Sequence, residues 1–269
     1  MVKINTTLCT GCAACMKDCF SRNIIIEDKI ARPISESCIL CGHCVAVCPT
    51  KAVEISDYDM DDVTDITTQK LTAAELVSFI KSRRSIRQYK DCPVEQDLIK
   101  QIIEAGRYTA TASNRQELSY IVIEKEMETF RALVIESLAN KGREILSANN
   151  AIPQLHIYAK RWIAIAEAYK KNPNEKDSVF FGAPAVILIA GDHPVDAGLA
   201  ASNIELAACA SGLGVLYSGF ISRGSDTARI KELIGVPAKK KILVTLVIGY
   251  PDVQYMRSAP RHKADIIWS

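Results

Sequence analysis

Eight of the ten cysteines lie within the first 48 residues, in two runs of identical spacing. The first run contains Cys9, Cys12, Cys15 and Cys19, and the second contains Cys38, Cys41, Cys44 and Cys48. Thiolates bind metals strongly, and in oxidising compartments paired thiols form disulfides. The two runs therefore indicate a region built around sulfur chemistry, and the question is which kind.

Three interpretations compete for these runs: disulfides, zinc sites and iron–sulfur clusters. The sequence reaches its first motif cysteine at position 9 without a charged and apolar export signal, so we expect an intracellular, cytoplasmic setting that disfavours disulfides. Zinc sites usually pair two short knuckles of two ligands, fewer than one run supplies. The pattern C-x2-C-x2-C-x3-C, followed by Pro49 in the second run, is the bacterial ferredoxin arrangement. Two copies predict two [4Fe-4S] clusters.

The N-terminal region thus resembles the two-cluster bacterial ferredoxins, in which the fourth cysteine of each run binds the other cluster. The resemblance implies that one cluster is held by Cys9, Cys12, Cys15 and Cys48. It implies that the other is held by Cys38, Cys41, Cys44 and Cys19. Residues 23–28 and 51–56, one segment after each run, are expected to form short strands. Cys92 and Cys209 lie outside the motif and are interpreted as packing residues.

A second candidate site begins at residues 83–89, with the sequence RRSIRQY. Arg83, Arg84 and Arg87 could form the polar end of the preceding helix, where cations interact favourably with the helix dipole. Guanidinium groups also bind phosphate oxygens bidentately, which makes the segment a candidate for a phosphate-bearing cofactor. Taken alone, the segment leaves both interpretations open.

Composition limits the classes of function. The chain has 269 residues, 48% of them hydrophobic and 24% charged, with a net charge of +2, as expected for a globular protein without a nucleic-acid partner. No apolar run approaches the roughly 18 residues needed to cross a membrane. The cysteine distribution predicts a ferredoxin-type domain at 1–56, an acidic, solvated linker at 57–70 and a larger domain at 71–269.

The larger domain alternates helical and strand patterns. Thr72 and Glu75 form a capping box that starts a helix. Helices are then predicted at 94–108, 127–140 and 197–214, and strands at 119–125, 185–191, 215–219 and 241–251. No Gly-x-Gly-x-x-Gly follows a strand, so we expect no Rossmann domain. Within 149–181, a set of aromatic residues is expected on one helix face, for core or dimer packing or to cover a cofactor: Tyr158, Trp162, Tyr169 and Phe180.

Four segments of this domain occur in the order and approximate spacing of the FMN-dependent nitroreductase family: 83–89, 110–116, 210–220 and 247–263. The region from about residue 71 resembles that family, and the whole chain resembles its ferredoxin-fused branch. The resemblance implies an α+β fold, with a small two-cluster ferredoxin-like domain followed by an α/β sandwich around a mixed, mainly antiparallel sheet. It also implies bound FMN and a homodimer with FMN at the subunit interface.

The family's FMN contacts can be carried over by position. Arg83, Arg84, Ser85 and Arg87 match the segment that holds the flavin phosphate, ribityl chain and pyrimidine edge. Thr111, Asn114 and Gln116 match a loop that reaches FMN from the other subunit. Ser218 and Gly219 match a turn whose backbone amide faces flavin N5, and Arg261 matches a C-terminal phosphate contact. Arg257, His262 and Lys263 are interpreted as solvated charges that could share the phosphate. No catalytic side chain is expected, because flavin N5 carries the chemistry.

The implied function is an oxidoreductase that relays electrons from ferredoxin or a similar donor, through the two clusters, to FMN. The expected acceptor is a small electron-poor molecule, either nitroaromatic or quinone-like. Two alternatives stay open. One is an NAD(P)H-dependent nitroreductase with the clusters as secondary carriers, and the other is an electron-transfer flavoprotein with a protein acceptor.

Overall fold

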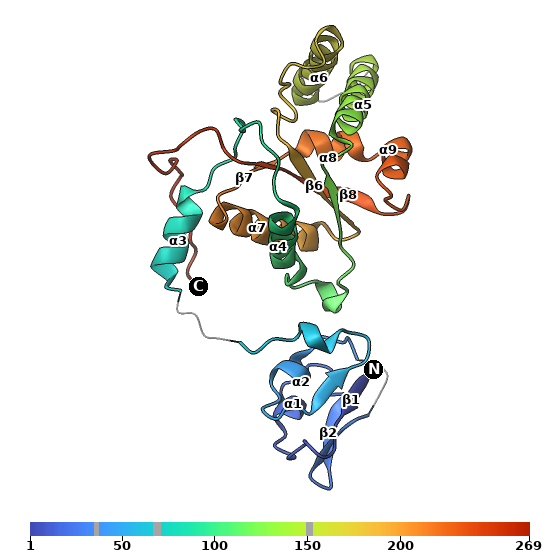
Figure 1. Ribbon diagram of the computed structural model, residues 1–269, viewed down its shortest axis with the longest axis vertical. Coiled ribbons are helices and arrows are strands. Elements are labelled where there is room, and N and C mark those ends of the chain that lie inside the picture. The colour runs from blue at the N-terminus through green and yellow to red at the C-terminus, as the bar shows by residue number, and fades with distance from the viewer. Residues whose placement is uncertain (35–37, 67–70, 149–152) are drawn as a thin grey trace. The chain divides into compact units, whose positions relative to one another are not determined.

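The chain forms two compact units in the computed structural model, which describes residues 1–34, 38–66, 71–148 and 153–269 (Figure 1). The smaller unit comprises Met1–Lys70 together with Thr111–Gln116, and the larger comprises Leu71–Ala110 and Glu117–Ser269. Sequence analysis placed 111–116 in the larger domain, whereas its contacts assign it to the smaller unit. Part of the predicted linker, residues 67–70, lies outside the described residues.

Two antiparallel strand pairs build the smaller unit. Strand β1 (Val2–Ile4) pairs with β4 (Val53–Ile55), and β2 (Ile24–Glu27) pairs with β3 (Ile30–Pro33). The predictions at 23–28 and 51–56 are confirmed as β2 and β4. Strands β1 and β3 were not predicted, because three or four residues carry too little alternation to stand out.

Two short helices follow the first cysteines of each run, α1 (Ala14–Lys17) and α2 (His43–Ala46). Each begins after a residue in the left-handed region, Ala13 with φ 62° and Gly42 with φ 76°. The two halves of the unit therefore repeat one local design. Their apolar side chains meet in a small core that includes Val2, Ile24 and Ile55.

The larger unit is built on a four-stranded sheet in the order β5-β6-β8-β7. Its strands are β5 (Ser119–Ile123), β6 (Ala185–Gly191), β7 (Gly214–Tyr217) and β8 (Lys241–Gly249), and each adjacent pair is antiparallel. A parallel bridge between Ser85 and Val215 adds a short contact beside β7. The sheet is therefore mixed and mainly antiparallel, as predicted.

Helices cover both faces of this sheet (Figure 1). Helices α4 (Gln96–Arg107) and α7 (Pro194–Ala210) lie on one face, where Ile187 and Ile189 of β6 point. The other face, with Val186 and Leu188, contacts α5 (Met127–Ser147) and α8 (Gly219–Ser225), which α6 (Pro153–Lys171) and α9 (Ala228–Leu233) flank. Every residue of β6 is buried, because both of its faces are covered. The predicted α+β sandwich is confirmed.

The aromatic residues of 149–181 divide between helix and turn. Helix α6 carries Tyr158, Trp162 and Tyr169, but Phe180 follows the end of this helix, so the prediction of one shared helix face is wrong for Phe180. Trp162 and Phe180 are each 1% exposed within the core, which confirms the packing role for these two. Residues 149–152 lie outside the described residues.

Helix α3 (Ala73–Ser82) begins with the predicted capping box. The Glu75 amide donates to Thr72 Oγ1 at 3.2 Å, and the Thr72 amide donates to Glu75 Oε2 at 2.9 Å. None of its residues is buried, and Leu76, Val77 and Ile80 are exposed on its apolar side.

None of the described helices is long and apolar enough to cross a bilayer.

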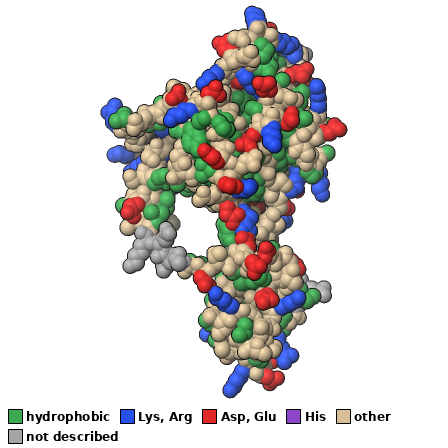
Figure 2. Space-filling model, viewed as in Figure 1, with side chains coloured by type: hydrophobic (Ala, Val, Ile, Leu, Met, Phe, Trp, Pro, Cys, Tyr) green, Lys and Arg blue, Asp and Glu red, His purple; other side chains and the backbone are tan. Residues whose placement is uncertain are grey.

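The predicted strand at 215–219 is too long at its end. Ser218 caps α8 by accepting a hydrogen bond from the Ile221 amide, so β7 ends at Tyr217. The apolar run of β7 continues into small residues without a break signal in the sequence, and α8 and α9 were not predicted. On the face seen in Figure 2, acidic and basic side chains are interspersed. This agrees with the near-neutral net charge.

Candidate redox sites

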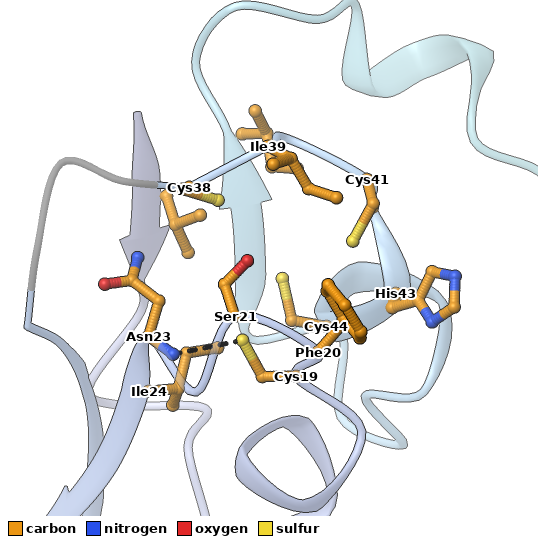
Figure 3. Close-up of a pocket in the computed structure, with 13 residues that line it drawn as sticks. Cys19, Phe20, Ser21, Asn23, Ile24, Cys38, Ile39, Cys41, His43 and Cys44 are labelled. Atoms are coloured by element: carbon orange, nitrogen blue, oxygen red, sulfur yellow. Dashed lines mark hydrogen bonds between the residues drawn. The ribbon is translucent and has the colours of Figure 1, made fainter. Parts of the chain in front are cut away.

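The first cavity of the smaller unit is lined by four cysteines, Cys19, Cys38, Cys41 and Cys44. Figure 3 shows their sulfurs gathered around this cavity, whereas the imidazole of His43 points away from it. The apolar side chains of Ile24 and Ile55 complete the lining. Three of the four cysteines belong to the second run, and Cys19 closes the first.

The second cavity has the complementary composition, with Cys9, Cys12, Cys15 and Cys48 in its lining. Ile26 and Val53 lie beside these sulfurs. The fourth cysteine of each run thus lies with the first three cysteines of the other run. This is the grouping that the resemblance to two-cluster ferredoxins implies.

Four backbone amides of the described residues lie within 3.4 Å of a motif sulfur and donate to it. The Asn23 amide donates to Cys19 Sγ at 3.2 Å, and the Ala52 amide donates to Cys48 Sγ at 3.2 Å. The other two donors are Ala31 to Cys9 and Leu40 to Cys38, each at 3.4 Å. Such donors stabilise negative charge on a thiolate and tune the potential of an attached cluster.

Gly11 shows how closely the backbone folds around the second cavity. Its φ is +67°, and a Cβ atom on it would lie 2.3 Å from the carbonyl oxygen of Lys29. Any side chain would therefore collide with backbone in a conformation that already disfavours L-residues. The chain between Cys9 and Cys12 can close around this cavity because glycine stands there.

The protonation of the cysteines differs with their surroundings. Burial raises the pKa of Cys44 to about 11, and the neighbouring Cys38 and Cys41 add to the effect. Burial also raises the pKa of Cys15. For Cys48, burial is outweighed by hydrogen bonds from Ala52 and Thr50, so its pKa falls below the usual value. A metal must displace protons from the buried thiols, which couples metal binding to proton release.

The two groups of four cysteine sulfurs fit iron–sulfur clusters. Within the described residues, no three His, Cys, Asp or Glu side chains converge closely enough to hold a single metal ion. The four sulfurs of each group surround a cavity with apolar walls and backbone N–H donors nearby. Such a setting suits a [4Fe-4S] cube held by four thiolates.

In the larger unit, residues 83–89 are fastened along the edge of the sheet. The Ile86 amide donates to the Val215 carbonyl at 3.0 Å, beside the bridge between Ser85 and Val215. The buried hydroxyl of Tyr89 lies 3.0 Å from the Ile86 carbonyl and 3.2 Å from that of Val247. The arginine segment therefore runs beside β7, the strand that leads into Ser218 and Gly219. The fold brings together three of the four segments that matched the family, because residues 83–89 contact both Val215 of segment 210–220 and Val247 and Pro251 of segment 247–263.

At the turn after β7, the two predicted residues have different roles. The Ser218 amide donates to the Thr245 carbonyl at 2.9 Å, and Ser218 Oγ accepts from the Ile221 amide. Gly219 begins α8, where amides have no partner within the helix. The amide of Gly219 is therefore among the donors that this turn can offer to a ligand.

Arg83 makes a contact that sequence analysis missed. Its Nη1 donates to Glu205 Oε1 of α7 at 2.8 Å, and Glu205 is 5% exposed. The hydroxyl of Tyr217 in β7 also hydrogen-bonds to Glu205. Burial raises the pKa of Glu205, although the Arg83 guanidinium opposes the shift. One feature of the sequence pointed toward this contact. Glu205 is the one charged residue in the alanine-rich stretch IELAACA, and a carboxylate on an apolar helix needs a partner when it is buried.

The remaining predicted FMN residues lie elsewhere. Thr111, Asn114 and Gln116 belong to the smaller unit, where Asn114 Nδ2 donates to the Leu40 carbonyl at 2.9 Å. Gln116 Nε2 donates to the Tyr58 hydroxyl at 2.8 Å. Arg261 is exposed and donates to the neighbouring Pro260 carbonyl at 3.0 Å.

Comparison with known proteins decides the family. Residues 80–250 match the model of the nitroreductase family. The chain belongs to the nitroreductase family. Residues 1–49 match the model of the 4Fe-4S dicluster domain, so the predicted fusion of a ferredoxin-type region to a nitroreductase region is confirmed.

Individual relatives of this nitroreductase-family chain are distant. An NADPH-dependent oxidoreductase of Staphylococcus aureus is 24% identical over 65% of the chain and 64% of its own length. A putative NADH dehydrogenase/NAD(P)H nitroreductase of Methanothermobacter thermautotrophicus is 24% identical over 68% of the chain and 80% of its own length. The chain thus spans less than two thirds of the Staphylococcus protein. A Bacteroides fragilis nitroreductase crystallised with bound FMN shares the fold, with a TM-score of 0.54 and 19% identity, over 72% of the chain and 98% of its own.

Proposed function

We propose that this nitroreductase-family protein is an FMN-dependent oxidoreductase that receives electrons through two [4Fe-4S] clusters. One observation carries the proposal: eight cysteines surround two cavities, with the fourth cysteine of each run exchanged, in a chain that also contains a nitroreductase region. When bound, the clusters would carry single electrons and the flavin would exchange one or two.

In this proposal the eight motif cysteines hold the clusters. Arg83, Arg84, Ser85 and Arg87 bind FMN along the edge of β7, and the Gly219 amide faces the flavin. Support comes from the bridge that places Ser85 beside β7 and from the Bacteroides fragilis nitroreductase, which was crystallised with FMN. Thr111, Asn114, Gln116 and Arg261 would complete the site in a dimer.

We also propose a cytoplasmic homodimer. The apolar side chains of α3 are exposed, and so are Ile266, Ile267 and Trp268 near the C-terminus. A second copy would cover such surface, since large exposed apolar side chains that cluster commonly mark protein interfaces. The electron donor would be ferredoxin or a similar carrier, and the acceptor a small nitroaromatic or quinone.

A second candidate is an enzyme that takes its electrons directly from NAD(P)H at the flavin, with the clusters as secondary carriers. The names of the Staphylococcus and Methanothermobacter relatives favour this donor. The names of these relatives do not mention clusters, so the use of the clusters is a matter for experiment.

An anaerobic reductive titration distinguishes the two candidates. Iron, sulfide and FMN are counted per chain, and the protein is then mixed with reduced ferredoxin or with NADH while absorbance and EPR are recorded. We expect about eight iron atoms and one FMN, with the flavin reduced by ferredoxin and not by NADH. Flavin bleaching by NADH before the clusters change would overturn the relay and support the second candidate.

A further inference from the structure

A buried carboxylate lies beneath the arginine segment. The Glu205 side chain is 5% exposed. Neighbours on the same helix are apolar and fully buried, among them Ala201, Ile204 and Ala208. Removing a carboxylate from water is costly unless it is paired and hydrogen-bonded. The fold keeps it at this position because Arg83 and the Tyr217 hydroxyl both donate to it.

The pair restrains the position of the guanidinium. Arg83 is the C-terminal cap of α3, at the start of the segment that runs beside β7. Its side chain is 28% exposed, so the group is neither free in solvent nor fully enclosed. A guanidinium group is planar and carries five N–H donors. The contact with Glu205 uses one nitrogen of the Arg83 guanidinium, so its other N–H groups remain for a ligand.

We propose that Glu205 is a positioning residue for the flavin: it holds the Arg83 guanidinium beside β7 so that its other N–H groups meet the cofactor at the turn of Gly219. This inference rests on the proposed function, because it assumes that FMN binds at residues 83–87. Tyr217, the residue before Ser218, contributes as well, since its hydroxyl hydrogen-bonds to the same carboxylate.

The pair has an electrostatic consequence. The carboxylate offsets much of the Arg83 charge, so the pair presents oriented donors with little net charge. Replacing Glu205 by Gln would leave the Arg83 cation unbalanced beside the flavin. A reduced flavin carries more negative charge than an oxidised one, so the substitution would make reduction easier and raise the flavin reduction potential.

The test uses the full chain with Glu205→Gln and Glu205→Asp, and measures FMN affinity by fluorescence titration and the flavin potential by redox titration. We expect the Gln variant to bind FMN about tenfold more weakly or worse, because one charge-assisted hydrogen bond is lost. Its potential should lie above that of the wild type. The Asp variant keeps the charge but retracts it by one methylene, so its affinity should fall while its potential stays near that of the wild type.

Asp177→Asn is the matched control. Asp177 is another buried carboxylate that contacts an arginine, with Arg131 Nε at 2.5 Å, and the amides of Val179 and Phe180, which also donate to it, do not belong to residues 83–89. This variant should lose stability without changing FMN affinity or potential. Unchanged affinity and potential in both Glu205 variants would overturn the inference alone. A wild-type protein that binds no FMN would overturn the proposed function as well.

Discussion

Cys19 and Cys48 show how much one residue decides in the smaller unit. Each lies in the cavity formed mainly by the other run, so each cavity depends on both halves of the unit. The contact exists because the two halves pack against each other through a shared apolar core. If Cys19 and Cys48 bind clusters in these exchanged positions, each cluster would need both halves of the smaller unit to be folded together.

Paired substitutions test the exchange directly. If Cys9 and Cys48 bind the same cluster, the Cys9→Ala/Cys48→Ala variant should lose about half of the iron, because only one cube is disrupted. The Cys38→Ala/Cys48→Ala variant should lose nearly all of it, since both cubes are affected. Iron and sulfide analysis after anaerobic purification gives the answer.

The reverse pattern would show that each run holds its own cluster. Cys92→Ala serves as the control, because Cys92 lies outside both cavities and should leave the iron content unchanged.

A second prediction at this scale concerns Arg83→Ala. The variant should purify with little FMN and a normal iron content, because the substitution removes a donor in the larger unit and leaves the cysteines intact. FMN released by denaturation is measured by fluorescence. Arg131→Ala, which removes the ion pair with Asp177, should keep its FMN. Stoichiometric FMN in the Arg83 variant would contradict the assignment of residues 83–87.

At the scale of elements, Tyr89 fastens the arginine segment to the sheet. Its hydroxyl reaches the carbonyls of Ile86 and Val247, and burial raises its pKa well above the ordinary value. Tyr89→Phe should destabilise the larger unit by about 1–2 kcal/mol, because buried carbonyls lose a donor. Urea unfolding followed by far-UV circular dichroism measures the loss.

If residues 83–89 are held mainly by this contact, FMN affinity should fall together with stability. Tyr255→Phe is the control, since Tyr255 is exposed. A fully stable Tyr89→Phe variant would show that the bridge of Ser85 to Val215 suffices.

Replacing either of two helical glycines by alanine should change the stability of the larger unit, in opposite directions. A Cβ on Gly142 of α5 would lie 2.8 Å from the Ala159 carbonyl oxygen of α6, so the two helices approach closely there. Gly142→Ala should cost about 1–3 kcal/mol, because backbone would have to move. Gly198 of α7 has nothing within 4 Å of its Cβ position, so Gly198→Ala should gain about 0.5–1 kcal/mol from helix propensity.

Thermal unfolding of both variants, monitored at a helix-sensitive wavelength, checks the contrast. A stabilised Gly142 variant would mean that α5 and α6 separate easily, against the packing described above.

At the scale of the whole molecule, the proposed relay requires both units. Replacing one ligand in each cluster, Cys12→Ala/Cys41→Ala, should abolish turnover driven by reduced ferredoxin while FMN stays bound. Chemical reduction of the flavin by dithionite should still support reduction of a nitroaromatic acceptor. Anaerobic steady-state assays with both reductants measure the difference.

Equal ferredoxin-driven rates in this variant and the wild type would show that electrons enter at the flavin. The single variant Cys92→Ala is the control, because Cys92 lies in neither cavity.

Local patterns in the sequence were sufficient for much of this protein. The cysteine spacing predicted two four-sulfur groups, and the capping box at Thr72 predicted the start of α3, because both depend on residues a few positions apart. The strand at 185–191 was recognisable from its unbroken apolar run, which reflects burial on both faces. Elements with a strong short-range signal were therefore predicted well.

Only the tertiary structure decided which groups meet across the chain. Glu205 and Arg83 are 122 residues apart, and no local pattern links a carboxylate in an alanine-rich helix to the end of α3. The arginine segment likewise meets the sheet through a long-range contact, since the Tyr89 hydroxyl reaches the carbonyl of Val247, 158 residues away. The sequence determined where the cysteine runs and the arginine segment lie along the chain. Burial and long-range hydrogen bonds determined how those residues are held, because desolvation forces each buried polar group to find a partner wherever the fold provides one.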